Sequence, residues 1–439
     1  MALLFDDKVD PAMLQTAAGY PQMSAMETTF LFSEKEKEVL KGLAEKVAEI
    51  AYLPIQQEKA KLWKALNDLK PIEPLVFIDP ENGWNEMITA DTLVCVDPLA
   101  RVWEMHLRKQ IYWFTQLKDD KVIEPYFDVP YSYCDNGWGL KLEKIGGKDG
   151  GAFSIKQAIV DYSKDFEHLH FPVIEMNHEQ SEKAMIIAQE LFDGILKVRR
   201  KNTWWWSHGL CQEFIYLRGL EDFMCDMIAE PEYFHAVMEM LCTGHLKRLD
   251  WLEENGLLAL NTEGTYIGSG GFGFTDELPT EGFDPLKVRT IDMWGFVEAQ
   301  ETVAVSPSMY AEFVLPYHIR IAERFGLNYY GCCEIYNTRW NYVKTIPRLR
   351  RISVSAWAEW DTVPEYLGKD YVASIKPSPA PLARKHMNED VVRADCKRAA
   401  AQIKGANCEF IMKDNHTLGG NPLNASRWVS IMREEIDKC

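Results

Sequence analysis

The feature that most constrains this sequence is a repeated alternation of short apolar runs with longer segments of helical periodicity. Runs of six or seven residues bounded by turn residues are typical of buried strands, and we predict eight: 74–79, 122–128, 203–208, 257–263, 327–333, 351–357, 371–376 and 408–414. Most are separated by segments with apolar residues three and four positions apart, such as 231–256 and 306–326, each ending in glycine. This alternation predicts an α/β fold, specifically a (β/α)8 TIM barrel. A doubly wound open sheet is the alternative, but no dinucleotide-type glycine fingerprint follows the first strand.

The chain divides into an N-terminal part, residues 1–70, and the barrel, residues 71–439. The first 30 or so residues are expected to form an arm. Ser33 and Glu36 have the spacing of a capping box, which predicts a helix from there to about Ile50. Long insertions are predicted near residues 132–200 and 264–293. The second is rich in glycine and is either a lid or substrate-binding element, or a decoration of the fold.

Composition excludes several classes of protein. A formal net charge of −18 would repel nucleic-acid phosphates, so no nucleic acid is expected as a partner. No apolar run reaches the ~18–20 residues of a membrane helix, and the acidic N-terminus does not resemble a secretory signal. The ten cysteines lack paired spacing, which indicates free thiols in a reducing cytoplasm.

Three segments carry a resemblance to a known superfamily. "IDMWGFVEAQETVAVSPSMYAEFVLPYHIRI", "AEPEYFHAVMEML" and "ISVSAWAEWDTVPEYLGKDYVASIKPSP" resemble sequences of the uroporphyrinogen decarboxylase superfamily, over roughly residues 70–435. The resemblance implies a TIM barrel and one of two activities. One is decarboxylation of uroporphyrinogen without a cofactor. The other is zinc-dependent methyl transfer to or from a corrinoid protein.

The segment after the first predicted strand separates these two activities. The true decarboxylases have an arginine-rich segment there, whereas this chain has Asp79 and Glu81. These carboxylates would repel a porphyrinogen bearing many carboxylates. The aspartate that the decarboxylases use after strand two has a counterpart in Asp128. The resemblance therefore favours the methyltransferase branch.

That branch has a His-x-Cys motif at the end of strand five and a second cysteine at the last strand. The corresponding residues here are Tyr330-Gly331-Cys332 and His416. Residues two apart on a strand share a face, so Cys332 and Glu334 could enter the barrel together. The resemblance thus implies a zinc site made by Cys332, Glu334 and His416, with one position open for the reacting group. The alternative is that Cys332 and Cys333 are buried packing residues, and a redox pair is disfavoured by ring strain.

Further candidates lie near the predicted strand ends. Strand alternation would place Trp204, Trp206 and His208 on one side, where an aromatic wall could stack on an aromatic ring or contact a quaternary ammonium. The predicted catalytic residues are Asp128, His208, Glu263 and Asp292, and the predicted substrate contacts are Asp79, Trp204, Trp206, Trp294, Tyr330 and Trp357. Buried packing is the alternative for each tryptophan, and a solvated or capping role for each carboxylate.

The predicted function is a methyltransferase of a corrinoid-dependent system. It would move a methyl group between a small donor, an aromatic methyl ether or methylamine-like compound, and a corrinoid supplied by a separate protein, with zinc assisting. A metal-free decarboxylase of a non-porphyrin or modified substrate, using Asp128 and His416, is the enzyme alternative. A non-catalytic partner-binding barrel is the second alternative, and the sequence leaves a homodimer open.

Overall fold

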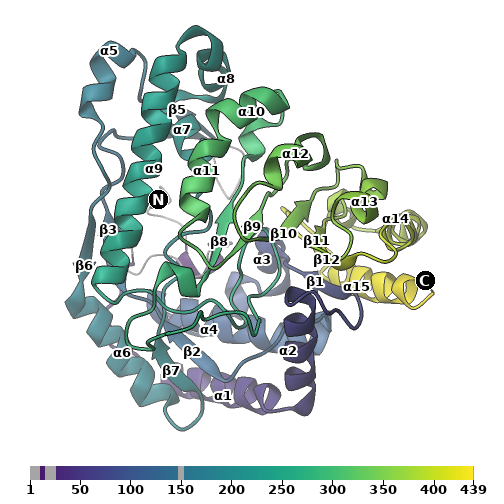
Figure 1. Ribbon diagram of the computed structural model, residues 1–439. Coiled ribbons are helices and arrows are strands. Elements are labelled where there is room, and N and C mark those ends of the chain that lie inside the picture. Colours follow the sequence, from purple (N-terminus) through teal and green to yellow (C-terminus); the bar gives the residue numbers. More distant parts are fainter. Residues whose placement is uncertain (1–9, 15–25, 147–152, 439) are drawn as a thin grey trace.

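The computed structural model describes residues 10–14, 26–146 and 153–438. It is an α/β structure built around a six-stranded parallel sheet in the order β1-β12-β11-β10-β9-β8 (Figure 1). Its strands are β1 (Leu75–Ile78), β8 (Trp294–Val297), β9 (Leu327–Tyr330), β10 (Leu349–Val354), β11 (Val372–Ile375) and β12 (Asn407–Met412). The α/β class predicted from the sequence is confirmed, and the first strand pairs with the last, Leu75 lying opposite Glu409.

A second parallel sheet has two strands, β2 (Tyr126–Val129) and β7 (Lys197–Arg200). Two of the predicted strands, 203–208 and 257–263, are not strands in the structure, whereas β7 and β8 were not predicted. The aromatic run at 203–208 has the length and apolar character of a buried strand, but the observed strand is β7, the charged segment just before it. The remaining six predicted strands overlap observed ones.

The insertion that follows β2 carries its own small sheets. β3 (Ser132–Asp135) pairs antiparallel with β6 (Ile174–Asn177), and β4 (Glu143–Gly146) pairs antiparallel with β5 (Phe153–Lys156). This insertion agrees with the predicted excess length near residues 132–200. The second insertion, 264–293, contains the isolated bridge between Tyr266 and Phe272.

Helices surround these sheets. The longer ones are α1 (Glu34–Ala51), α2 (Pro54–Asn67), α4 (Pro98–Tyr112), α6 (His178–Phe192), α7 (Cys211–Arg218), α8 (Leu220–Ala229), α9 (Pro231–Glu254), α11 (Leu315–Ala322), α14 (Glu389–Gln402) and α15 (Leu423–Ile436). Short helices are α3 (Trp84–Met87), α5 (Tyr162–Asp165), α10 (Pro307–Phe313), α12 (Trp340–Val343) and α13 (Val363–Tyr366). No helix in the described residues combines the length and apolar character of a membrane span.

The predicted start of the first long helix is confirmed. Ser33 is the N-cap of α1, and its side chain and that of Glu36 form the reciprocal hydrogen bonds of a capping box. The arm expected before it falls mostly on residues 1–9 and 15–25, which lie outside the described residues. The predicted helix at 306–326 is interrupted at Val314, which ends α10 and precedes Pro316 of α11.

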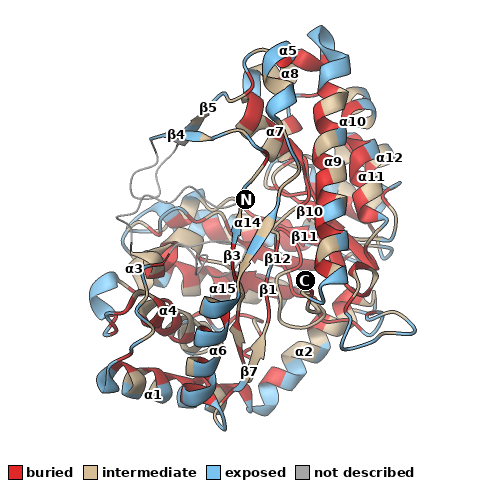
Figure 2. Ribbon diagram, turned by 90° about the vertical axis from the view of Figure 1, so that its left-hand side faces the viewer, coloured by how far each residue is buried: buried red, intermediate tan, exposed pale blue. Residues whose placement is uncertain are grey.

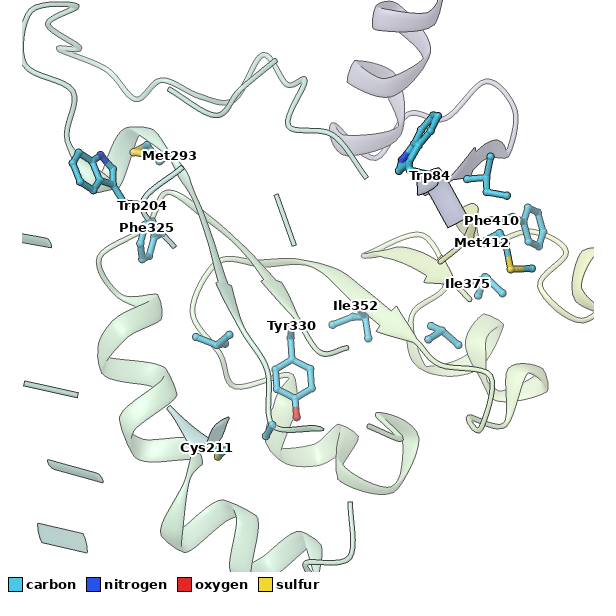
Figure 3. Packing of buried hydrophobic residues seen from close by; sticks show 14 of the residues in the cluster. Trp84, Trp204, Cys211, Met293, Phe325, Tyr330, Ile352, Ile375, Phe410 and Met412 are labelled. Atoms are coloured by element: carbon cyan, nitrogen blue, oxygen red, sulfur yellow. The ribbon is translucent and has the colours of Figure 1, made fainter. Parts of the chain in front are cut away.

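The strands of the main sheet are buried, while α1 and α6 expose one side to solvent (Figure 2). Tyr330, Ile352 and Ile375, from three neighbouring strands, belong to the largest apolar cluster (Figure 3). Phe77 and Ile411 belong instead to a smaller cluster with Phe272 of the second insertion. Within β1, Val76 and Ile78 belong to the first cluster and Leu75 and Phe77 to the second, so the strand presents its two faces to different clusters, as alternation requires.

Candidate functional site

A cavity of about 580 Å3 lies at the carboxyl ends of the parallel strands. Asp79 follows β1, Cys332 follows β9 and Lys413 follows β12, while Asp128 and Arg199 belong to β2 and β7, and all five line this cavity. The volume is in the range of cavities that bind small molecules. Substrate sites of parallel α/β folds lie at this edge of the strands, so the cavity is the candidate active site.

The wall of the cavity carries both signs of charge. Its acidic residues are Asp79, Glu81, Glu124, Asp128 and Asp414, and its basic residues are Lys109, Lys121, Arg199, Lys201 and Lys413. Aromatic residues complete the wall: Phe77, Trp84, Trp113, Trp206, Tyr266 and Phe272. Asp79, Glu81 and Asp128 were singled out from the sequence, whereas Glu124 and Asp414 were not. The basic residues were missed, because lysines and arginines scattered through a chain give no pattern until the fold brings them together.

Cys332 is a buried thiol that faces this cavity. The hydroxyl of Ser269 donates a hydrogen bond to its Sγ at 3.0 Å, and the Sγ of Cys333 lies 3.6 Å away. The hydrogen bond from Cys333 lowers the pKa of Cys332 to about 6; burial opposes this shift, and Lys376, Lys413 and Ser269 add to it. Thiols with a pKa below neutrality are largely thiolate at pH 7, and the thiolate is the nucleophilic form.

Lys376 follows β11 and is buried beside this thiol. Its amine donates hydrogen bonds to the hydroxyls of Ser269 and Ser353, the latter at 2.7 Å, and approaches the carbonyl oxygen of Cys332 at 3.4 Å. Ser353, at the end of β10, also donates to that carbonyl at 2.6 Å. Lys376 was not among the predicted residues. A lysine directly after an apolar strand was the available signal.

The glycine-rich segment, residues 264–273, brings Ser269 to the site. A Cβ atom on Gly268 would lie 2.6 Å from the ring of Tyr329, and one on Gly271 would lie 2.3 Å from the guanidinium of Arg351. Gly271 also has a φ of +81°, which disfavours other residues. Glycine therefore lets this segment pass close to the strands. Since Gly264, Thr265 and Tyr266 line the cavity, the segment is part of the site rather than a decoration.

Two acidic groups of the cavity are poised to hold a proton near neutral pH. Burial raises the pKa of Glu81 to about 7, although Lys413, whose amine lies 3.4 Å away, opposes the shift. Burial and the repulsion of Glu263 raise the pKa of Glu124 to about 7. A carboxyl group with a pKa near neutrality can donate or accept a proton during a reaction.

The predicted zinc ligands do not form a ligand set. The carboxylate of Glu334 accepts hydrogen bonds from the backbone amides of Cys332 at 2.7 Å and Ala299 at 2.8 Å, and neither it nor His416 lines the cavity. His416 is exposed. In the described part of the chain, no three His, Cys, Asp or Glu residues are grouped so that they could hold a metal ion. The residues present therefore do not fit the zinc site that the resemblance implies.

The end of β9 explains why the expected strand alternation fails. The strand stops at Tyr330, and Gly331 has a φ of +92°, which turns the chain before Cys332. Tyr330 consequently packs towards Tyr310 of α10, with ring centroids 6.4 Å apart, and does not line the cavity. Tyr329 occupies the opposite face, against Arg351. The predicted substrate contact of Tyr330 is thus replaced by a packing role.

Two of the predicted catalytic carboxylates are held in ion pairs. Arg199 lies 2.5 Å from Asp128 and 2.5 Å from Glu263, and Lys201 is also 2.5 Å from Glu263. Asp128 lines the cavity, whereas Glu263 does not. A third, Asp292, is buried away from the cavity. It binds the guanidinium of Arg289 and the hydroxyl of Thr280, which is a structural role at the start of β8.

His208, the remaining predicted catalytic residue, is buried outside the cavity wall. Its Nδ1 lies 3.2 Å from Nδ1 of His245, whose Nε2 lies 2.6 Å from the carboxylate of Glu213. Burial, and then the neighbouring His245 and Arg248, hold the pKa of His208 well below its ordinary value. His208 is therefore neutral and packs against Trp205 and Phe325.

The predicted tryptophans occupy different environments. Trp206 lines the cavity. The ring nitrogens of Trp204 and Trp294 donate to the carbonyls of Leu257 and Gly273, both at 3.0 Å, and both rings are buried beside a smaller pocket. Trp357 is 75% exposed and does not line the cavity. Of the predicted substrate contacts, the structure therefore brings together Asp79 and Trp206.

Comparison with known proteins leaves the family open. No family model matches the chain, and no curated protein matches it. Among solved structures, a methyltransferase from Methanosarcina mazei is similar at 12% identity and a TM-score of 0.49, with 86% of this chain and 97% of that chain covered. At that identity and score, the likeness establishes neither a shared fold nor a shared activity. Membership of the uroporphyrinogen decarboxylase superfamily stays a prediction.

Proposed function

We propose that this protein is a methyltransferase and that its reaction takes place at Cys332. The observation that carries the proposal is the presence of a thiol with a lowered pKa and of a carboxylic acid, Glu81, with a raised pKa in one cavity. Moving a methyl group from an ether oxygen needs a nucleophile for the carbon and a proton for the leaving oxygen, whereas an ammonium nitrogen leaves as a neutral amine and needs the nucleophile alone. At neutral pH the cavity supplies both.

In the proposed reaction the thiolate of Cys332 attacks the methyl carbon of the donor. A sulfur–carbon bond forms while the carbon–oxygen or carbon–nitrogen bond breaks. An ether oxygen takes the proton of Glu81 as it leaves, whereas an ammonium nitrogen leaves as a neutral amine. The amine of Lys413 faces both Cys332 and Glu81, so it favours the negative charge that remains on the carboxylate. Burial of Cys332 keeps water from competing with the donor.

The cavity wall supports a small aromatic ether or a methylated ammonium compound as the donor. Trp84, Trp113 and Trp206 present aromatic surface on which a ring can stack or a methylammonium group can rest. The resemblance adds a corrinoid on a separate protein as the acceptor. The methyl group would pass from the sulfur of Cys332 to that acceptor in a second transfer, which breaks the sulfur–carbon bond and releases the thiolate. Zinc is not retained, because the predicted ligands do not group together.

We further propose that the two parallel sheets together form the predicted barrel. The backbone amide of His208, beyond β7, donates to the carbonyl of Phe296 in β8 at 3.0 Å. At the other side, the amide of Asp120, ahead of β2, donates to the carbonyl of Val76 in β1 at 2.9 Å. These bonds support closure at both junctions between the sheets.

A carboxy-lyase is the second candidate. The lysines of the cavity, Lys109 and Lys121 among them, could receive a carboxylated substrate, whereas Asp79 and Glu81 count against uroporphyrinogen itself. The acid–base pair expected for that activity is not assembled, since Asp128 is paired with Arg199 and His416 is exposed outside the cavity.

A donor panel separates these candidates. Purified protein would be incubated with methoxylated benzoates, methylamines and betaine, with reduced free cobalamin as the acceptor, and demethylated product would be quantified. We expect product with at least one donor and loss of more than about 99% of the rate in Cys332→Ala, as for removal of a nucleophile. Cys333→Ala should lose less activity, because it removes only a hydrogen bond that favours the thiolate. Equal rates in wild type and Cys332→Ala would reject the proposal. Carbon dioxide release from carboxylated members of the panel would favour the carboxy-lyase. Absence of any reaction with every compound of the panel would favour the non-catalytic barrel.

A further inference from the structure

Lys376 is a buried lysine without a carboxylate partner. Among the described residues, no carboxylate lies within ion-pairing distance of its amine, which contacts two serine hydroxyls and the carbonyl of Cys332. Burial lowers the pKa of Lys376, and Cys332 opposes that shift. A buried amine without an anion loses its proton, because an isolated charge is costly in a medium of low dielectric constant.

The sulfur of Cys332 is the nearest group that can become that anion through a hydrogen-bonded path. The hydroxyl of Ser269 accepts from the amine of Lys376 and donates to Sγ of Cys332, the second contact being 3.0 Å. Ser353 fixes the other side of the arrangement, because it accepts from the same amine at 2.7 Å and donates to the carbonyl of Cys332 at 2.6 Å. The amine, the hydroxyl and the thiol are thus connected by hydrogen bonds.

Other charged groups surround the thiol and affect its ionisation. Those facing Cys332 are Cys333, Glu334, Lys376, Lys413, Glu298 and Glu301. Burial, and then the neighbouring Glu301, raises the pKa of Glu298. Burial also raises the pKa of Glu301, and the nearby Glu334 adds to that shift. Raised pKa values favour the protonated carboxyl, so these two groups oppose a thiolate less than ordinary carboxylates would. The two lysines are the positive groups of this set.

We propose that Cys332 and Lys376 form a thiolate–ammonium pair bridged by Ser269, and that this pair provides the positive charge that the sequence had assigned to zinc. The sulfur–hydrogen bond of Cys332 breaks and a nitrogen–hydrogen bond forms at Lys376, with the Ser269 hydroxyl relaying the proton. No electron is transferred and no further reactant is consumed. Lys376 is in this sense a positioning residue, acting on the donor only through Cys332.

The pair deepens the proposed function, on which its catalytic meaning rests, but it can be measured without any methyl donor. If methyl transfer were not the activity, the thiol would still titrate as described. The pair is also consistent with the finding that the predicted zinc ligands do not group together. A thiolate already paired with a buried ammonium has less to gain from a zinc ion, and the other predicted ligands are engaged with backbone amides or exposed.

The test is the pH dependence of alkylation at Cys332. Full-length protein would be treated with iodoacetamide between about pH 5 and pH 10, a range that includes both the lowered pKa of Cys332 and the pKa of an ordinary thiol. Tandem mass spectrometry would assign the label to Cys332 or Cys333. We expect the rate at Cys332 to reach half of its maximum near pH 6 in the wild type. In Lys376→Met the midpoint should rise by about 1–3 pH units, as expected when an adjacent opposite charge is lost.

Two further variants keep this test decisive. Ser269→Ala should raise the midpoint less than Lys376→Met, and it remains informative if the lysine variant does not fold, which circular dichroism would show. Lys109→Met, which removes another lysine of the same cavity, should leave the midpoint unchanged. A chelator should leave the wild-type profile unchanged.

Three results would each overturn the pair. The first is a wild-type midpoint at that of a free thiol, about 8.5. The second is a midpoint that neither Lys376→Met nor Ser269→Ala shifts. The third is the finding of one zinc ion per purified chain, together with a change in the alkylation profile when the chelator removes it. That result would mean that a metal ion, and not Lys376, stabilises the thiolate.

Discussion

Cys332 and Glu81 are shifted in opposite directions within one cavity. The hydrogen bond from Cys333 and then the nearby lysines favour the ionised thiol, whereas burial favours the protonated carboxyl. Both residues are therefore in their reactive forms only over a limited pH range. The thiolate is populated above about pH 6 and the carboxylic acid below about pH 7. Such pairs of oppositely perturbed groups are typical of catalytic sites.

This pair predicts a bell-shaped pH dependence of kcat/KM for methyl transfer from an aromatic ether. The acid limb should fall near pH 6, where the thiol becomes protonated, and the alkaline limb near pH 7, where Glu81 loses its proton. Glu81→Gln should lower the rate by about 100–10,000-fold, which is the usual contribution of general acid catalysis, and should remove the alkaline limb. Steady-state kinetics across the pH range check this. An alkaline limb that persists in Glu81→Gln would assign the proton donor to another group, with Glu124 the next candidate.

Among the elements, the glycine-rich segment contributes most to the site. It supplies Ser269 to the thiol and Tyr266 to the cavity wall, and its glycines let it run against the side chains of the strands. The sequence showed its richness in glycine but not which strands it would meet. Glycine permits such close approach of a backbone to neighbouring side chains.

Gly268 provides a direct test of that contact. A methyl group at this position would lie 2.6 Å from the buried ring of Tyr329, so Gly268→Ala should displace the segment and carry Ser269 away from Cys332. We expect the alkylation midpoint of Cys332 to rise and the free energy of unfolding to fall by about 1–3 kcal/mol, as for other overpacked sites.

The matched control is Gly42 in α1, where an added methyl group would meet nothing within 4 Å. Gly42→Ala should leave the thiol unchanged and stabilise the protein by about 0.5–1 kcal/mol through helix propensity. Chemical denaturation and the alkylation assay measure both effects. An unchanged thiol midpoint in Gly268→Ala would show that the segment does not set the environment of Cys332.

At the scale of the whole molecule, basic residues gather around the cavity although the chain as a whole is acidic. The formal net charge is −18, yet five basic residues line the cavity and Lys376 and Arg351 are buried nearby. The apolar strands and the α1 cap could be predicted because burial and capping leave local patterns. β7 could not, since its residues Arg199 and Arg200 are compensated by groups distant in sequence, such as Asp128 and Pro130. The Lys376–Ser269–Cys332 contact likewise depends on three separate segments.

The central claim is that Cys332 receives the methyl group. The most direct measurement is a single-turnover reaction with a donor carrying an isotopically labelled methyl group, without any acceptor, followed by peptide mass spectrometry. The donor would be one that the panel shows to be demethylated. We expect the label on the sulfur of Cys332 in wild type and no label there in Cys332→Ala. Demethylated donor with no label on Cys332 would contradict it.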